Sequence, residues 1–297
     1  MSRTRSAPWT PDPAEPGPGP SQSGPAQSGT ARTGPDTGPA GPEPAVSLRG
    51  LTRVYGSGSA QSVAVDRLSL EVPRGAFYGL VGRNGAGKTT VLSMLTGLLR
   101  PTEGTAHVGG IDVWQQPRAA KARMGVLPDG VRLFDRLAGR QLVTYAGLLR
   151  GMDKDVVDHR TEDLLRAMDL LEAAGTPVMD YSAGMTKKIA LAAALIHAPD
   201  LLVLDEPFEA VDPVSAANIR ELLHGFARAG GTVIVSSHVM DLVQRMCDHV
   251  AVMDRGVLRA CGTVDEVRQD RPLEDVFVEL VGGSARAGEG LEWLRPR

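Results

Sequence analysis

The spacing G-x-x-x-x-G-K-T constrains this chain more than any other feature, and it occurs in the stretch GRNGAGKTT at residues 82–90. The apolar run AFYGLVG before it predicts a buried strand, and VLSMLTGLL after it predicts a helix running to about Leu99. Between a strand and a helix, glycines let the backbone wrap a phosphate, whose charge the amides and the helix N-terminus stabilise. A chance glycine-rich turn is the alternative, but the Lys-Thr pair and both flanks favour a phosphate-binding loop.

Each residue type in this loop has a predicted contact with a nucleoside triphosphate. Lys88 is expected to reach the β- and γ-phosphate oxygens and to take part in catalysis, and the Thr89 hydroxyl is expected to bind Mg²⁺. The other predicted nucleotide contacts in the loop are Gly82, Asn84, Gly85, Gly87 and Thr90. ATP and Mg²⁺ are therefore the predicted cofactors.

A second motif, LLVLDEP at residues 201–207, ends a buried strand on two adjacent carboxylates. Two desolvated carboxylates repel each other, so a positive charge is expected beside them, and a metal ion is the first candidate. At the carboxyl end of a parallel strand, Asp205 is predicted to bind Mg²⁺ directly or through water. Glu206 points elsewhere and is predicted to be the general base. An exposed strand end or a helix cap is the alternative for such an acidic pair.

Composition narrows the class of protein. The 297 residues are 42% hydrophobic, enough for one large core or two modest ones, and the formal net charge of −3 disfavours general nucleic-acid binding. The two cysteines have no C-x-x-C spacing, so buried thiols in a reducing compartment are expected. Arg3 and Arg5 lack a following apolar segment, and the run IALAAALIHAPDLLVL is interrupted, so we expect neither export nor a membrane span.

The chain divides by composition. Residues 1–44 hold about half of the 21 prolines and predict a disordered tail. AVSLRGLTRVY and VAVDRLSLEV alternate and predict antiparallel strands of a small sheet, whereas residues 138–171 have a helical period. From Ser182, helices alternate with the strands LLVL, TVIVSS and HVAVM, which predicts a parallel α/β sheet. LEDVFVELV predicts a helix with Leu273, Val276, Phe277 and Leu280 on one face, for core docking or, as the alternative, a partner; the last fifteen residues are predicted to fray.

These motifs, together with YSAGM, AVDP and VIVSSH in their order, resemble the ATP-binding subunit of an ATP-binding cassette (ABC) transporter over about residues 46–280. The resemblance implies an α/β P-loop NTPase fold, with a RecA-like parallel core sheet, a small antiparallel β subdomain and an inserted helical subdomain at about 130–183. The ATP-binding domain is then expected at 45–270, and a C-terminal helix with a frayed tail at 271–297. The resemblance is to stand-alone cassettes of ABC-2 or drug-export type.

The stretch YSAGM resembles the family's signature, usually LSGGQ, with its serine and second glycine kept at Ser182 and Gly184. In this family two cassettes close head to tail, and each signature covers the ATP of the partner. The resemblance thus implies a homodimer, or a heterodimer with another cassette, whose ATP sites are shared. Ser182 taken alone is equally an ordinary helix cap.

Four further residues take roles from the resemblance. His238 corresponds to the switch histidine, which contacts the γ-phosphate and holds Glu206 and water, although a lone histidine is more often structural. Asp212 corresponds to the aspartate that acts across the dimer. Tyr55 corresponds to the aromatic that stacks on adenine, although an aromatic at a strand end often only packs. Asp129 falls where the family has a glutamine, and its carboxylate still offers oxygen to a metal-bound water.

The resemblance implies an ATPase that moves a separate transmembrane permease, with the chain cytoplasmic and peripheral on the inner face of the membrane. The Asp129 variant leans toward export, and the cargo does not follow from the sequence. One alternative is a non-transport ABC ATPase acting on ribosomes or DNA, which the acidic charge disfavours. The other is an ATP-gated binding module with weak hydrolysis, which the intact Lys88, Asp205, Glu206 and His238 disfavour.

Overall fold

The small antiparallel sheet is present near the start of the folded chain in the computed structural model, which describes residues 43–282. Its strands follow the order β2-β1-β4-β5, and the pairs β1-β2, β1-β4 and β4-β5 are antiparallel; the bounds are β1 (Val46–Tyr55), β2 (Ser62–Val72), β4 (Glu103–Val108) and β5 (Ile111–Asp112). The prediction for β1 and β2 is therefore confirmed, and β4 and β5 extend the sheet beyond it. The predicted tail, apart from residues 43 and 44, and the last fifteen residues lie outside the described range.

The core sheet has the order β10-β9-β3-β8-β7-β6. Its strands are β3 (Phe77–Val81), β6 (Met124–Leu127), β7 (Leu201–Leu204), β8 (Thr232–Ser237), β9 (His249–Asp254) and β10 (Val257–Thr263). All neighbouring pairs are parallel except β9-β10, which is antiparallel at one edge. The predicted parallel α/β sheet is confirmed, with β6 and the antiparallel β10 as additions.

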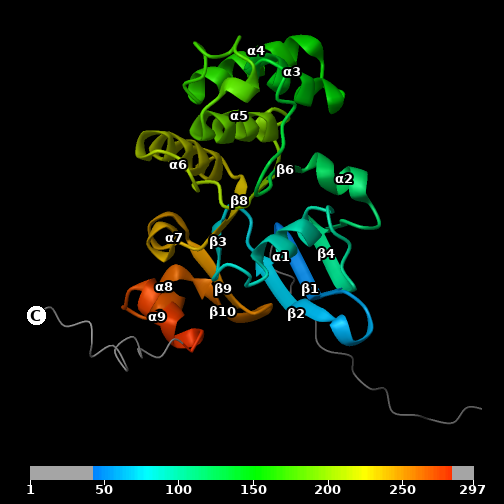
Figure 1. Ribbon diagram of the computed structural model, residues 1–297, viewed down its shortest axis with the longest axis vertical. Helices are drawn as coiled ribbons and strands as arrows, with labels where there is room; N and C mark the ends of the chain where they lie inside the picture. The colour runs from blue at the N-terminus through cyan, green and yellow to red at the C-terminus, as the bar shows by residue number, and fades with distance from the viewer. Residues whose placement is uncertain (1–42, 283–297) are drawn as a thin grey trace, which may run out of the picture. The chain divides into compact units, whose positions relative to one another are not determined.

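Helices surround this sheet, and Figure 1 shows α3, α4 and α5 gathered together in green. The bounds are α1 (Lys88–Leu95), α2 (Pro117–Ala122), α3 (Gly139–Leu149), α4 (Lys154–Ala167), α5 (Ala183–Leu195), α6 (Pro213–Arg228), α7 (Met240–Met246), α8 (Val264–Arg268) and α9 (Leu273–Leu280), with single 3-10 turns at Gly58–Ala60 and Val178–Asp180. No strand lies between residues 138 and 171, as predicted. None of the helices within residues 43–282 combines the length and the apolar character that a membrane span needs.

Helix α1 ends earlier than the apolar pattern predicts. The period continues to Leu99, but the helix stops at Leu95. The Thr96 hydroxyl donates to the Leu92 carbonyl at 2.8 Å, and Gly97 adopts a φ of +69°. A side chain that bonds the last carbonyls, followed by a left-handed glycine, ends a helix even where apolar residues continue.

Two apolar clusters lie on opposite faces of the core sheet because neighbouring side chains of a strand point to opposite sides. On β3, Tyr78 and Leu80 belong to the cluster shared with α1 and the small sheet. Phe77 and Val81 belong to the cluster shared with α5, α6 and α7. Helix α9 docks on this second cluster through Leu273 and Phe277, with Val276 buried and Leu280 partly so, and the core-docking prediction is confirmed.

Candidate nucleotide-binding and hydrolysis site

Four predicted functional segments meet at one edge of the core sheet. The strands β3, β6, β7 and β8 are mutually parallel in register, so their carboxyl ends lie along the same edge. The residues that follow these ends are Gly82 after β3, Asp129 after β6, Asp205 after β7 and His238 after β8. Ligands of parallel α/β sheets bind beyond this edge. The topology thus collects segments that are spread between residues 82 and 238 of the chain.

The phosphate loop needs glycine at two positions for steric reasons. Gly87 has a φ of +100°, and a Cβ on it would lie 2.6 Å from the carbonyl oxygen of Ala64. A Cβ on Gly82 would lie 2.6 Å from the carbonyl oxygen of Met253. Any other residue would force neighbouring backbone to move. The loop therefore packs directly against β2 and the end of β9.

A short chain of backbone hydrogen bonds fixes the loop from behind. The amide of Gly256, in the turn between β9 and β10, donates to the Ala86 carbonyl at 2.9 Å. The Gly256 carbonyl accepts from the Asp66 amide in β2, also at 2.9 Å. Within the loop, the Ala86 amide donates to the Arg83 carbonyl at 3.0 Å. The loop is thus tied to both sheets.

In front of the loop lies a cavity of about 390 Å³. Its volume is in the range of small-ligand sites. Most of the predicted nucleotide and catalytic residues line it, namely Asn84, Gly85, Gly87, Lys88, Thr89, Thr90, Asp129, Glu206 and His238. Arg83 and Glu209 also line it and were not predicted. Gly82 is not in the wall, but its carbonyl oxygen accepts a hydrogen bond from Lys88 Nζ at 2.8 Å.

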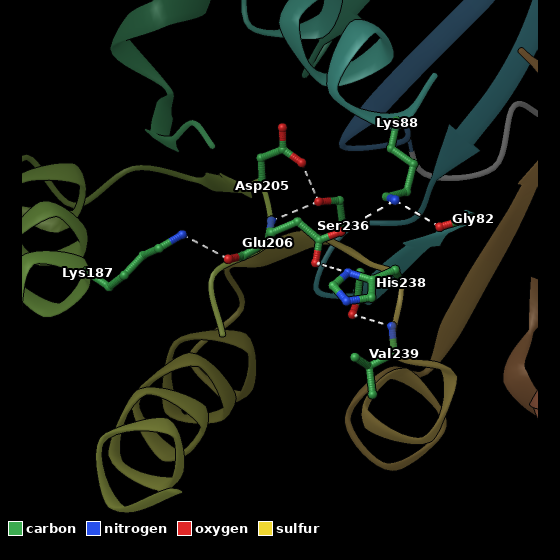
Figure 2. A network of polar contacts seen from close by, with 9 residues as sticks. Gly82, Lys88, Lys187, Asp205, Glu206, Ser236, His238 and Val239 are labelled. Atoms are coloured by element: carbon green, nitrogen blue, oxygen red, sulfur yellow. Dashed lines mark hydrogen bonds and ion pairs between the residues drawn. The ribbon is translucent and has the colours of Figure 1, made fainter. Parts of the chain in front are cut away.

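The charged groups of the cavity pair with one another (Figure 2). Lys88 Nζ lies 3.4 Å from Glu206 Oε1, with only 6% and 13% of the two side chains exposed. On the other side, His238 Nδ1 lies 3.1 Å from Glu206 Oε2. Because the lysine and the glutamate are nearly buried, the opposite charge of the partner offsets the cost of removing each charge from water. The Glu206 carboxylate therefore connects the phosphate loop with the histidine.

Asp205 points away from this pair and is held by Ser236. The Ser236 hydroxyl donates to Asp205 Oδ1, and its oxygen accepts from the Glu206 amide at 2.9 Å. Ser236 is fully buried in β8. No motif gives Ser236 a role, although a serine inside the apolar strand TVIVSS is a signal that points to it.

The residues predicted to bind a metal fit that task. Thr89, Asp129 and Asp205 all line a smaller cavity of about 120 Å³, and Thr89 and Asp129 also line the larger one. Hydroxyl and carboxylate oxygens are the donors that Mg²⁺ takes. No group of three or more His, Cys, Asp or Glu residues that could hold a metal occurs within residues 43–282. A site completed by phosphate and water oxygens matches this sparse donor set, because Mg²⁺ keeps several waters.

The signature residues lie outside the cavity of their own chain. Ser182 Oγ accepts from the Met185 amide at 3.3 Å and caps α5. Asp212 Oδ1 caps α6 by accepting from the amides of Val214 and Ser215, and these hydrogen bonds lower the pKa of Asp212. A Cβ on Gly184 would lie 3.2 Å from Asp212 Oδ2. The two helix starts are thus adjacent, and their role toward a partner stays a prediction.

Tyr55 does not line the cavity. It ends β1 with 42% of its surface exposed, and the guanidinium carbon of Arg53 lies 4.7 Å from its ring centroid. This is a cation–π contact with a neighbour on the same strand. The adenine-stacking role of Tyr55 stays a prediction.

A phosphate loop and an acidic strand end that meet at the same edge of a parallel sheet define a P-loop nucleotide hydrolase. Residues 65–209 match the family model for ABC transporters. The chain is 36% identical over 214 residues to the ABC transporter ATP-binding protein NatA of Bacillus subtilis (strain 168), covering 72% of this chain and 87% of that protein. It is 35% identical over 246 residues to the daunorubicin/doxorubicin resistance ATP-binding protein DrrA of Streptomyces peucetius, covering 83% and 73%.

Solved structures agree with these relatives. The structure of the ATP-binding subunit of an ABC transporter matches with a TM-score of 0.72 and 25% identity, covering 79% of this chain and 98% of that chain. A dimeric ATP-binding cassette in a post-hydrolysis state, bound to ADP and Pi, matches in fold with a TM-score of 0.69 and 22% identity, covering 74% and 98%. The chain belongs to the ABC transporter ATP-binding family and is an ATPase, which confirms the resemblance seen in its motifs.

Proposed function

We propose that this chain binds ATP with Mg²⁺ in the larger cavity and hydrolyses it with Glu206 as general base, and that the cycle moves a separate membrane permease. The observation that carries the proposal is the position of the Glu206 carboxylate between Lys88 and His238 on the cavity wall. A carboxylate between a phosphate-binding lysine and an imidazole can take a proton from a water beside a γ-phosphate.

Binding of ATP exchanges the partners of Lys88. Lys88 Nζ is engaged by Glu206 Oε1 and by the Gly82 carbonyl. When a γ-phosphate oxygen takes the place of Glu206 Oε1 beside Lys88, Oε1 becomes free to accept a proton from water. Oε2 remains at His238, which orients the carboxylate. The binding of ATP therefore frees the carboxylate oxygen that deprotonates the attacking water.

Thr89 and Asp205 hold Mg²⁺ in this proposal, with Asp129 reaching it through water. All three line the smaller cavity, which supports the assignment. The bound ion supplies positive charge that offsets the negative charge of the β- and γ-phosphates. Asp205 is 3% exposed and stays oriented by the Ser236 hydroxyl.

Two cassettes close head to tail in the active state, either two copies of this chain or this chain with another cassette. Ser182, Gly184 and Asp212 lie together but outside the cavity of their own chain, which supports a role at the ATP of the partner. The start of α5 offers free amides to a γ-phosphate. The adenine contact of Tyr55 belongs to the same bound state.

The permease binds the helical subdomain at about residues 130–183, and this contact places the chain on the inner face of the membrane. Phe134 and Leu149 are 60% and 66% exposed there, and Phe134 packs edge-to-face on Tyr145 with ring centroids 5.4 Å apart. Exposed apolar side chains that lie together mark protein interfaces, and the Phe134–Tyr145 pair is such a contact. Relatives include daunorubicin/doxorubicin and linearmycin resistance ATP-binding proteins and a Nod factor export protein, and we take export as the direction of transport.

Substitution of Glu206 tests the chemical part of the proposal. Glu206→Gln keeps the shape of the side chain but cannot accept the proton, so we expect loss of steady-state ATP turnover, retained ATP binding and an ATP-dependent dimer in size-exclusion chromatography. Lys88→Ala is expected to lose ATP binding instead. Turnover by Glu206→Gln at the wild-type rate would remove Glu206 from the role of base.

Copurification tests the transport part. The full chain, expressed in turn with the multi-span membrane proteins of its organism, is expected to be recovered with one of them in a detergent-solubilised complex. Phe134→Asp together with Leu149→Asp is expected to abolish recovery and to leave ATP binding by the isolated chain unchanged. A chain that never associates with a membrane protein would contradict the transport role.

A further inference from the structure

The backbone of Glu206 is held in an unfavourable conformation. Its φ of +46° lies in the left-handed region, which non-glycine residues rarely adopt. Residues at functional sites keep such a conformation only when surrounding contacts impose it. The contacts on both sides of the Glu206 backbone therefore decide where its carboxylate lies.

One of these contacts comes from a helix of another segment. On the amide side, Ser236 Oγ accepts from the Glu206 N–H at 2.9 Å. On the carbonyl side, Lys187 Nζ, from α5, donates to the Glu206 oxygen at 2.9 Å (Figure 2), and the Glu209 amide donates to the same oxygen at 3.2 Å. The Glu209 bond closes a local turn, so Lys187 is the long-range contact on this side.

We propose that Lys187 is a positioning residue for Glu206, acting through the hydrogen bond to its carbonyl oxygen. The proposal rests on the proposed role of Glu206 as general base. Among the described residues, no carboxylate lies within 4.0 Å of Lys187 Nζ, so its ammonium group is directed to this carbonyl and not to an acidic side chain. A hydrogen bond from an ammonium group is stronger than one between neutral groups, and Lys187 is only partly exposed.

The position of Lys187 in α5 gives this contact a second consequence. The same helix begins at Ser182, the end that covers the ATP of the partner in the proposed dimer. Lys187 therefore ties the signature end of α5 to the backbone of the proposed general base in the same chain. A shift of α5 on dimer closure is transmitted to the Glu206 backbone through one hydrogen bond.

Lys187→Met tests this contact, because methionine keeps the length of the side chain and removes the donor. We expect the kcat of ATP hydrolysis by the full chain to fall at least tenfold, while the Kd for ATP changes less than twofold. Lys187→Arg retains a charged donor and is expected to keep at least one third of kcat. Lys154→Met, which removes an exposed lysine of α4 paired with Asp158, is the matched control and is expected to match the wild type.

A second measurement separates positioning from support of the fold. In the Glu206→Gln background, Lys187→Met is expected to leave the ATP-dependent dimer intact, because the hydrogen bond from Lys187 positions the group that accepts the proton, and that proton transfer is not needed for ATP binding or closure. Loss of that dimer, or a wild-type kcat for Lys187→Met, would overturn the inference. If Glu206→Gln itself turns over normally, the proposed function fails, whereas an inactive Glu206→Gln beside a fully active Lys187→Met defeats only the role of Lys187.

Discussion

Ser236 donates its hydroxyl hydrogen to Asp205 and thereby joins the central strand β8 to the acidic end of β7. The same oxygen accepts the amide of Glu206, so one buried hydroxyl orients both the predicted metal ligand and the predicted base. Neither bond crosses the cavity, which leaves its front free for a nucleotide. The acidic pair is therefore organised from behind, by the neighbouring strand.

Ser236→Ala is expected to lower the free energy of unfolding by about 1–3 kcal/mol, because it leaves a buried carboxylate oxygen and a buried amide without partners. ATPase kcat is expected to fall as well, since Asp205 and Glu206 both lose a fixed contact. Urea unfolding and steady-state turnover measure the two effects. Ser237→Ala is the matched control, because Ser237 is also buried in β8 but its hydroxyl, within the described part of the chain, bonds only the Val239 amide. Equal losses of kcat in both variants would contradict the assignment.

Glu206→Gln is expected to tighten ADP binding, because Lys88 no longer has to leave a carboxylate. The pair is 3.4 Å apart and nearly buried, and a gain of about 1 kcal/mol, roughly fivefold in Kd, is reasonable for a partly screened pair. Titration calorimetry with ADP measures this gain without trapping an ATP-bound dimer. Glu209→Gln removes a charge that lines the same cavity but is not paired with Lys88, so we expect a smaller change. An equal gain in both variants would indicate general electrostatics.

Gly87→Ala is expected to destabilise the phosphate loop and to weaken ATP binding. The new Cβ would lie 2.6 Å from the Ala64 carbonyl oxygen, in addition to the strain of a φ of +100°. Gly151→Ala is a control that separates the two effects, because Gly151 has a φ of +74° with no atom within 4 Å of its Cβ position. Strain alone costs about 1–2 kcal/mol, and we expect Gly87→Ala to exceed that by a further ~1–3 kcal/mol in urea unfolding. A similar loss of unfolding free energy in both variants would show that the loop shifts to make room for the new Cβ at little cost.

His197 is expected to make the fold less stable in mild acid. Burial, helped by the charges of Arg150 and Arg160 and opposed by a contact with the Met124 carbonyl, lowers the pKa of His197 to about 4. Its Nδ1 is buried and has no hydrogen-bond partner among residues 43–282. Because the unfolded chain takes up the proton near pH 6.5 and the folded chain does not, stability is present above pH 6.5 and is lost as pH falls toward 4.

The expected loss between pH 7.5 and pH 5 is about 2 kcal/mol, measured as the free energy of urea unfolding. His197→Gln removes the titrating group and can keep a hydrogen bond to the Met124 carbonyl, so this part of the pH dependence is expected to disappear. A pH dependence that is unchanged in His197→Gln would show that other groups cause it.

The residues that the sequence could predict are those whose role depends on local pattern. The glycines and Lys88 follow from the loop spacing, and Asp205 follows from its place at the end of an apolar strand. Parallel pairing of the strands predicts that these positions meet at one edge of the sheet, and the structure places them there. Local pattern and topology together were enough for this part of the site.

Contacts between distant segments could not be predicted in this way. Lys187 reaches the Glu206 carbonyl only because α5 packs against β6, the neighbour of β7, and no spacing in the sequence records that approach. Strand β10 was missed because an edge strand carries a weaker apolar pattern than a central one.

The hydrogen bonds from Asp66 through Gly256 to Ala86 make the phosphate loop a rigid receptor before any ligand arrives. A nucleotide entering the cavity meets amides that are already arranged, so little of its affinity is lost to ordering the loop. Discrimination between nucleotide states must then come from the parts that do change partners, above all the Lys88 ammonium group. In this cassette backbone hydrogen bonds hold the loop in place, and under the proposed function the Lys88–Glu206 pair is the part that changes when a nucleotide binds.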